Sequence, residues 1–392
     1  MRGLNRTIRL NVFGFFVSSL CLTFCMLLFL GAAVASDVKP EQESAQTTKP
    51  RVEVVFVLDT TGSMAGLIEG AKKKIWSMAN TIVDQNPDAD IYVGLVGYRD
   101  IGDEYVTKQF PLTTDIQQIY GELLTFSAHG GGDTPESVNE ALDVAVTRLG
   151  WSDPKESNAS RILFLVGDAP PHMDYKQDRK YQDVVSEAVQ KGIIVNAVQC
   201  GNMQSTTLVW KEIAQLGKGE YMAIPQDGGR VVVIETPYDI TIREIQIRIN
   251  KTVIPYGSIL QQRAVSEKAK MYEAAPAPAS ADMASYVSKS GKGEKAVTGH
   301  GDLVADSKAD KEILGKLKDE ELPEWLRRMS ADERRKYLAT QAEEREDLTR
   351  QLAVQVKQRD DYIRAKTTEG AAAAPVDSFD VNVANALKKQ IK

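Results

Sequence analysis

Short apolar runs alternate with amphipathic stretches from Arg51 to Asn250. The runs 52–58 and 162–166 are almost entirely apolar, which is typical of strands covered on both faces. Residues 105–112 include Pro111 and polar side chains, which predicts an edge strand. The predicted strands are 52–58, 91–97, 105–112, 162–166, 193–198 and 221–224. Their alternation with helical patterns predicts an α/β fold with a doubly wound, mostly parallel sheet.

Apolar side chains at helical spacing predict helices between these strands. The stripes cover residues 67–82, 138–149, 181–191 and 208–216, and we interpret each as packing against the sheet. In residues 242–249 the isoleucines fit both a helical face and the alternation of a strand, and we favour a helix. These elements together predict one domain over residues 51–255.

The composition changes after this domain. From Glu267 to Lys308 it is rich in Ala, Pro, Ser, Gly and Lys, which predicts a flexible linker over residues 256–308. Residues 309–392 are dense in charge of both signs and predict a helical tail. Within the tail, Ser330 and Glu333 have the spacing of a capping box that opens a long helix.

Two apolar patterns lie on the tail. Leu348, Leu352 and Val356 recur at four-residue steps and form one seam, too short to define a coiled coil. A solvated charged helix and a helix that binds a partner or self-associates are both open at this point. Residues 383–391 place Val383, Leu387 and Ile391 on one face, which predicts a short amphipathic helix that docks on another part of the protein.

The amino terminus has the pattern of an export signal. Three arginines precede the apolar run 12–30, and Ala33-Val34-Ala35 fits a cleavage site, so residues 1–35 are predicted to be a signal peptide. The run is almost long enough to span a bilayer, so an uncleaved anchor at 12–30 is the alternative and the only membrane contact we expect. Residues 36–50 would then be a short linker. The protein is expected in the periplasm, at the cell surface or secreted.

Cysteine content and charge narrow the picture further. Cys200 is the only cysteine outside the signal segment, so no internal disulfide is expected, and its place after an apolar run predicts a buried thiol. The 392 residues carry 54 acidic and 48 basic side chains, for a net charge of −6 without a basic block. Nucleic-acid binding is therefore not expected.

The first strand ends in a cluster of oxygen-bearing side chains. Asp59, Thr61 and Ser63 follow the apolar run and precede the first helix. They would lie at the carboxyl end of a central strand, where ligands of open α/β sheets bind. One carboxylate and two hydroxyls are hard oxygen donors, which favours Mg²⁺, or Ca²⁺ or Mn²⁺, over zinc or copper.

The pattern Asp-x-Thr-Gly-Ser-Met resembles the metal-ion-dependent adhesion site of von Willebrand factor type A domains. Two further loops strengthen the resemblance. Gly130-Gly131-Gly132-Asp133-Thr134 is similar to the family's second loop, and Asp168 ends an apolar strand, as the family's distal aspartate does.

The resemblance implies a function in binding. Asp59, Thr61, Ser63, Thr134 and Asp168 would hold the ion, with Asp133 as the alternative to Thr134. A Glu or Asp of a protein partner would complete the metal shell. Gly130, Gly131 and Gly132, flanked by His129 and His172, would form the rim that meets this partner.

Other functions remain in view. The acids among residues 98–104 fit either a second cation site or an ordinary solvated loop. Ser63, Asp168 and His172 follow the chain order of some hydrolases, but the Gly-x-Ser-x-Gly elbow is absent, so we expect no enzyme activity. A structural envelope scaffold that acts through its helical tail is the main alternative, and a metal-dependent hydrolase is less favoured.

Overall fold

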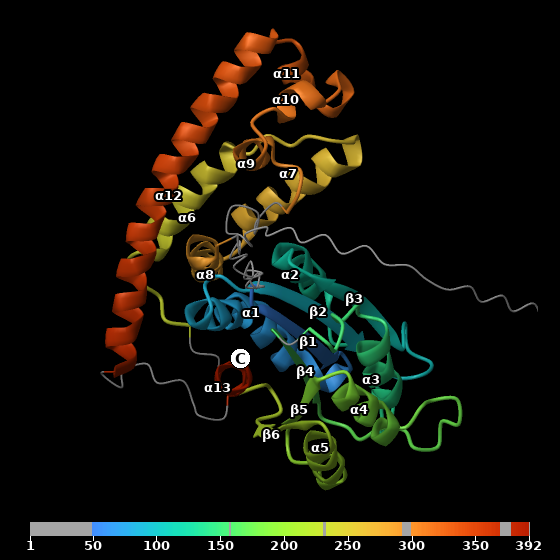
Figure 1. Cartoon of the computed structure of the whole chain (residues 1–392). Helices are drawn as coiled ribbons and strands as arrows, with labels where there is room; N and C mark the ends of the chain where they lie inside the picture. The colour runs from blue at the N-terminus through green and yellow to red at the C-terminus, as the bar shows by residue number, and fades with distance from the viewer. Residues whose placement is uncertain (1–48, 157, 230–232, 292–298, 369–377, 392) are drawn as a thin grey trace, which may run out of the picture. The chain divides into compact units, whose positions relative to one another are not determined.

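The computed structural model describes residues 49–156, 158–229, 233–291, 299–368 and 378–391 (Figure 1). The predicted signal segment 1–35 and nearly all of the predicted linker 36–50 lie outside these residues. Among the helices of the described ranges, none combines the length and the apolar character needed to cross a bilayer.

A six-stranded sheet forms the centre of the α/β part, in the order β3-β2-β1-β4-β5-β6. β3 is antiparallel to β2, and the other neighbours are parallel. The predicted strands, including the edge strand, are confirmed with ends shifted by a few residues. The strands are β1 (Arg51–Asp59), β2 (Asp90–Tyr98), β3 (Thr107–Thr113), β4 (Ala159–Gly167), β5 (Ile193–Cys200) and β6 (Lys218–Ile224). Cys200 is fully buried, as predicted.

Helices cover both faces of the sheet. Val54 and Phe56 of β1 point into the cluster that contains α1, whereas Val55 and Val57 point into the cluster that contains α3 and α4. This alternation is the pleat of a strand buried on both sides. The helices of this part are α1 (Ala65–Gln85), α2 (Ile116–Thr125), α3 (Val138–Thr147), α4 (Tyr181–Gln190), α5 (Gln204–Leu216) and α6 (Asp239–Lys251). The helix predicted at 242–249 is thus confirmed, and α2 is an element that the sequence reading did not assign.

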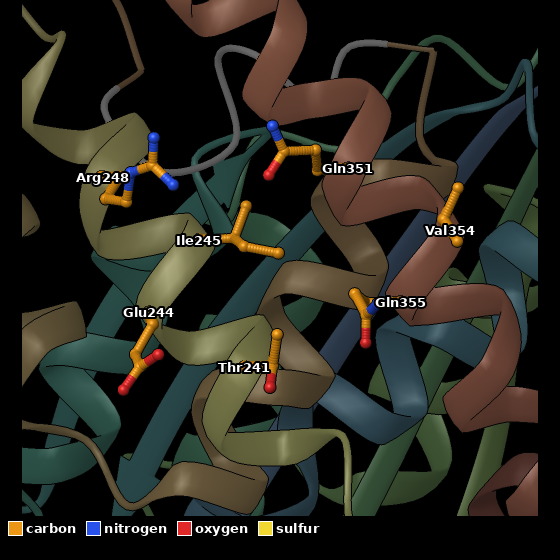
Figure 2. Close-up of a pocket in the computed structure, with 7 residues that line it drawn as sticks. All are labelled: Thr241, Glu244, Ile245, Arg248, Gln351, Val354 and Gln355. Carbon is orange, nitrogen blue, oxygen red and sulfur yellow. The ribbon is translucent and has the colours of Figure 1, made fainter.

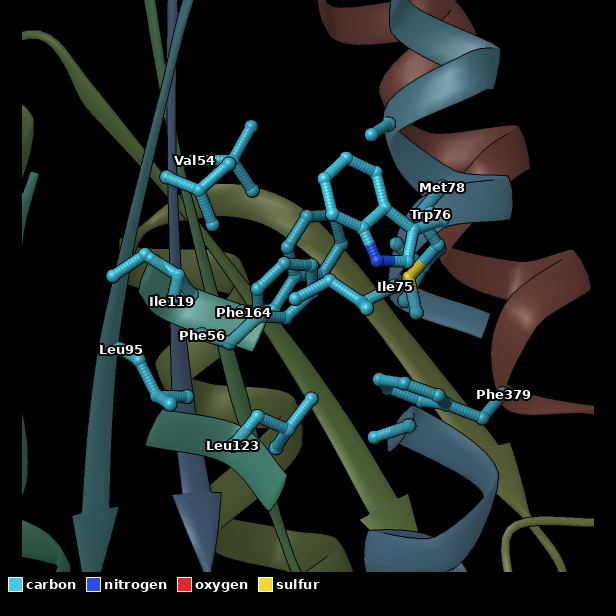
Figure 3. Packing of buried hydrophobic residues seen from close by; sticks show 14 of the residues in the cluster. Val54, Phe56, Ile75, Trp76, Met78, Leu95, Ile119, Leu123, Phe164 and Phe379 are labelled. Atoms are coloured by element: carbon cyan, nitrogen blue, oxygen red, sulfur yellow. The ribbon is translucent and has the colours of Figure 1, made fainter. Parts of the chain in front are cut away.

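The carboxyl-terminal helix α13 (Phe379–Gln390) completes one face of the core. Figure 3 shows the rings of Phe56 and Phe164 close together, with Phe379 approaching from α13. The ring centroids of Phe56 lie 5.4 Å from those of Phe164 and 6.5 Å from those of Phe379. Val383 and Leu387 are fully buried in the same cluster, so the predicted docking of this helix is confirmed.

The segment predicted to be a flexible linker, 256–308, is largely helical where it is described. It contains α7 (Ile259–Ala274), α8 (Ala277–Lys289) and α9 (Leu303–Ala309). Pro278 lies in the first turn of α8, where a proline removes no helical hydrogen bond. Met283 and Tyr286 of α8 are buried in the α1 cluster, and the rings of Trp76 and Tyr286 are 5.6 Å apart. The linker prediction was wrong because composition does not reveal burial against a distant helix.

The tail contains the predicted long helix, α12 (Ala331–Thr368), preceded by the short helices α10 (Ile313–Lys316) and α11 (Glu324–Arg327). The capping box is present: the Ser330 amide donates to Glu333 Oε2 at 2.7 Å, and the Glu333 amide donates to Ser330 Oγ at 3.3 Å.

The seam Leu348, Leu352 and Val356 is buried against α6 and α8 of the same chain. It is therefore neither solvated nor free for a partner helix, which corrects the two readings left open for it. Figure 2 shows α6 and α12 side by side, with Ile245 and Val354 among the residues that line a pocket between them.

Two arginines of α12 form buried ion pairs. Arg345 bonds both carboxylate oxygens of Asp302 and also donates from Nε to Thr252 Oγ1 at 2.7 Å. Arg359 donates to Asp239 of α6 and Asp282 of α8. These contacts fix α12 on the helices beneath it, because a buried guanidinium needs its carboxylate partners.

Candidate metal site

The turn after β1 holds its side chains together by local hydrogen bonds. Asp59 is fully buried, and its Oδ1 accepts from the Thr61 amide at 2.8 Å and from Thr61 Oγ1 at 2.6 Å. Thr61 Oγ1 lies 3.3 Å from Ser63 Oγ, and Ser63 is exposed at the start of the short 3₁₀ helix η1 (Gly62–Met64). The predicted trio therefore forms one cluster of oxygens that is open to solvent at Ser63.

Asp168 reaches the same cluster from the neighbouring strand. β4 is parallel to β1 with Leu58 opposite Val166, so Asp59 and Asp168 leave the sheet at the same edge. The Asp168 main-chain carbonyl accepts from Thr206 Oγ1 at 2.8 Å, and its Oδ2 accepts from Gln226 Nε2 at 2.5 Å. Gly167 is needed before it, because a Cβ there would lie 2.2 Å from the Tyr98 hydroxyl and 3.3 Å from Asp59 Oδ2.

Glu136 is a site residue that was not predicted from the sequence. Its side chain is buried, and a Cβ on Gly131 would lie 3.1 Å from Glu136 Oε1 and 2.9 Å from Thr61 Cβ. Glu136 and the Thr61 turn therefore both lie against Gly131, with no room for a larger residue at that position. The sequence did contain a signal for Glu136, since this acid follows Thr134 by two residues and Thr134 belongs to a predicted site loop.

Three carboxyl groups face one another across this cluster. Burial raises the pKa of Asp59 to about 7, with the carboxylate of Asp168 adding to the shift. Burial, together with the charges of Asp59, Asp100, Asp103 and Asp168, raises the pKa of Glu136 to about 9. Several carboxyl groups that are buried close together resist ionisation, because their negative charges repel one another. Among the described residues, the cluster therefore lacks a compensating positive charge.

The donor set fits a hard divalent ion. Asp59 Oδ2 and Glu136 Oε2 are buried and have no hydrogen-bond partner among the described residues. Buried carboxylate oxygens are normally paired, hydrogen-bonded or bound to a metal. Carboxylate and hydroxyl oxygens are the ligands that Mg²⁺ and Ca²⁺ prefer.

The glycine-rich loop is fastened beside this turn. The Gly62 amide donates to the Gly130 carbonyl at 3.1 Å, and the Gly131 amide donates to Asp103 Oδ2 at 3.2 Å. Gly130 has a φ of 77°, and a Cβ there would lie 2.2 Å from Asp103, so only glycine fits. Asp103 is thus part of a loop anchor rather than of a solvated loop.

The remaining predicted residues lie around this cluster. Thr134, Gly132 and His129 are exposed, and within the described ranges Thr134 makes no hydrogen bond to the Asp59 turn. Asp133, the predicted alternative to Thr134, lies near Asp100 and His172. His172 is buried.

Part of this chain is similar to known proteins. Residues 53–235 match the family model of the von Willebrand factor A domain. An alpha-protein kinase, vwkA, of Dictyostelium discoideum is 29% identical over 125 residues, 31% of this chain and 19% of that protein. A putative ariadne-like RING finger protein of Acanthamoeba polyphaga mimivirus is 27% identical over 125 residues, 31% of this chain and 11% of that protein. The match thus spans less than a fifth of either relative.

Solved structures are also similar to this chain. BatB from Bacteroides thetaiotaomicron covers 44% of this chain and 90% of its own, with 20% identity and a TM-score of 0.34. An aerotolerance-related membrane protein from Bacteroides fragilis covers 45% and 92%, with 18% identity and a TM-score of 0.31. On the family match and the doubly wound sheet described above, residues 53–235 form a von Willebrand factor A domain.

Proposed function

We propose that this domain binds a protein partner through a divalent cation, Mg²⁺ in the first place. Asp59, Thr61, Ser63 and Asp168 would hold the ion, with Glu136 as a further oxygen donor beside them. The observation that carries the proposal is the pair of buried carboxylate oxygens, Asp59 Oδ2 and Glu136 Oε2, without a partner among the described residues.

The position of this cluster supports binding of a partner. It lies at the carboxyl edge of the parallel strands, and Ser63 is exposed there. Two of the ligands, Thr61 and Ser63, are neutral hydroxyls, and Ser63 is exposed, so the ion would keep an exchangeable position on its solvent side that an acidic group can fill. A Glu or Asp of the partner is therefore the proposed recognition element, and the rim at Gly130–Gly132 is where its chain would lie. Thr134 stays a proposed ligand on the strength of the family resemblance.

Binding is favoured over catalysis. His172 is held by Asp174 and faces Asp100, so it is not oriented by Asp168 as a hydrolase triad would require. A scaffold role of the tail has less support, since its seam is used within the chain. Export to the periplasm or cell surface is part of the proposal and rests on the sequence of residues 1–35.

The experiment compares wild-type protein with Asp59→Asn and with Asp88→Asn. Asp88 is exposed in the loop before β2, at the opposite edge of the sheet, and serves as the matched control. Mg²⁺ at about 100 times its Kd should stabilise a binding-competent protein by about 2.7 kcal/mol. We expect this gain in wild type and Asp88→Asn but not in Asp59→Asn.

The partner is then sought by pull-down from the native cell envelope with Mg²⁺ or with a chelator. The proposal requires partners that are recovered only with Mg²⁺ and lost in Asp59→Asn. Recovery of the same proteins under both conditions would overturn it. Ester or phosphate hydrolysis that disappears in Ser63→Ala would replace it with an enzyme.

A further inference from the structure

A second group of metal-ligating side chains lies beside the site described above. Asp100 follows β2, Asp133 is on the glycine-rich loop and His172 follows β4. One ligand atom from each of the three lies within 4.8 Å of the other two. Asp100 and His172 are buried and Asp133 is exposed, so the group is open on one side only.

Asp100 is held in place by two hydroxyl groups. Its Oδ1 accepts from Ser137 Oγ at 2.7 Å, and its Oδ2 accepts from the Tyr175 hydroxyl at 2.9 Å. The Tyr175 ring stacks on the His172 ring, with 3.9 Å between centroids and 6° between planes. Such supporting contacts orient ligands before a metal arrives.

The contact between His172 and Asp174 decides where the histidine lone pair is. His172 Nδ1 lies 2.8 Å from Asp174 Oδ1. A carboxylate only accepts, so Nδ1 carries the proton and the lone pair of the neutral ring is on Nε2. A carboxylate that bonds the outer nitrogen of a histidine is the usual second contact of a metal-bound imidazole.

His172 Nε2 faces Asp100 without a hydrogen bond. The residue is 7% exposed, and Nε2 is buried and has no hydrogen-bond partner in the described chain, although Asp100 Oδ2 is 3.3 Å away. A lone pair and a carboxylate repel at this separation unless a cation lies between them. In a tetrahedral zinc site with bonds of about 2.0–2.1 Å, neighbouring ligand atoms are about 3.3–3.4 Å apart. The observed separation matches that spacing.

We infer that Asp100, Asp133 and His172 form a second metal site, distinct from the Asp59 cluster, that binds a divalent transition-metal ion such as Zn²⁺. One imidazole and two carboxylates favour such an ion over Mg²⁺, which prefers oxygen ligands alone. The open side at Asp133 leaves a position for water or a ligand.

The position of Asp133 gives the ion a role that rests on the proposed function. Asp133 is joined to Gly132 on one side and to Thr134 on the other. An ion that fixes Asp133 to Asp100 and His172 would hold the whole glycine-rich loop in one place. The loop could then present Thr134 to the first ion only when both ions are bound.

The test is titration of the full chain with Zn²⁺ by calorimetry, in excess Mg²⁺. We expect one Zn²⁺ per chain, with binding lost in His172→Ala. Asp174 is an exposed residue, so Asp174→Asn leaves the core intact, and it should bind Zn²⁺ about 10–100-fold more weakly. His300→Ala is the matched control, since His300 is exposed and remote in sequence, and it should bind as wild type does.

Asp59→Asn separates the two sites. It should keep its affinity for Zn²⁺, so a failure of the Mg²⁺ site leaves this inference standing, and the reverse also holds. Equal zinc affinity in wild type, Asp174→Asn and His172→Ala would overturn the inference. So would nitrogen NMR that shows both ring nitrogens of His172 protonated in the presence of Zn²⁺, because the group would then be an ion pair.

Discussion

Arg359 Nε and Asp239 Oδ1 form an ion pair 2.8 Å apart in which both side chains are about 5% exposed. The pair joins α12 to α6, and a second nitrogen of the same guanidinium donates to Asp282 of α8 at 2.7 Å. Three helices that are far apart in the chain are therefore joined through one side chain.

Removal of this guanidinium should be costly. Arg359→Ala leaves the buried carboxylate of Asp239 and the partly buried carboxylate of Asp282 without this partner, and we expect the free energy of unfolding to fall by about 3–5 kcal/mol. Urea denaturation followed by circular dichroism measures it. Arg350→Ala is the control, because Arg350 pairs with Glu346 on the exposed face of α12 and should cost under about 0.5 kcal/mol. Equal losses in the two variants would contradict this account.

The C-terminal helix should contribute to the stability of the α/β core. Phe379→Ala removes a ring that packs against Phe56, and a cavity there should cost about 3–5 kcal/mol. Leu260 on α7 is 75% exposed, so Leu260→Ala should change stability by less than about 0.5 kcal/mol. Thermal unfolding of both variants decides the matter, and an unchanged midpoint for Phe379→Ala would rule out the docking of α13.

The acid cluster should make the metal-free protein less stable at alkaline pH. The folded pKa values of Asp59 and Glu136, about 7 and about 9, lie above the ordinary values of 3.8 and 4.5. A carboxyl group with a raised folded pKa contributes stability that is complete below its ordinary pKa and is lost as the pH rises through the folded value. With chelator present, stability should therefore decline between about pH 5 and pH 9. Denaturation curves across this pH range test the decline, which should be smaller in Mg²⁺. An identical decline with and without Mg²⁺ would count against a metal site that Asp59 and Glu136 share.

Glu136→Gln should change the metal-free and metal-bound proteins in opposite directions. The amide is neutral at every pH, so the metal-free protein should gain about 1 kcal/mol or more at neutral pH. The same variant lacks a charged donor, so its stabilisation by Mg²⁺ should be smaller than that of wild type. Glu140→Gln is the control. Glu140 is partly buried and lies four residues after Glu136, and its replacement should leave the Mg²⁺ effect unchanged. A Glu136→Gln protein that gains the full Mg²⁺ effect would remove Glu136 from the site.

The sheet was predictable because each of its central strands is buried on both faces. A segment such as 52–58 is then apolar at every position but Glu53, and that pattern is visible without a structure. The turn at Asp59, Thr61 and Ser63 was equally accessible, since all three residues are close in sequence and follow such a strand.

The role of Glu136 was harder to predict because it depends on charges that are distant in sequence. Its raised pKa comes from burial and from the acids at the ends of β1, β2 and β4. Helix α2 could have been found from Asp115, which caps it by accepting from the Gln118 amide at 3.0 Å, and from Ile116, Ile119 and Leu123 on one face. Helix α8 could not, because its composition is that of a linker and its burial depends on Trp76.

The packing of Phe379 against Phe56 also sets the order of events when the chain is made. β1 is synthesised early and α13 late, yet both supply rings to one apolar cluster. During synthesis, Phe56 and Phe164 lack part of their cover until α13 emerges. The growing chain therefore carries an apolar surface that stays partly uncovered until residues 379–387 are available to pack on it.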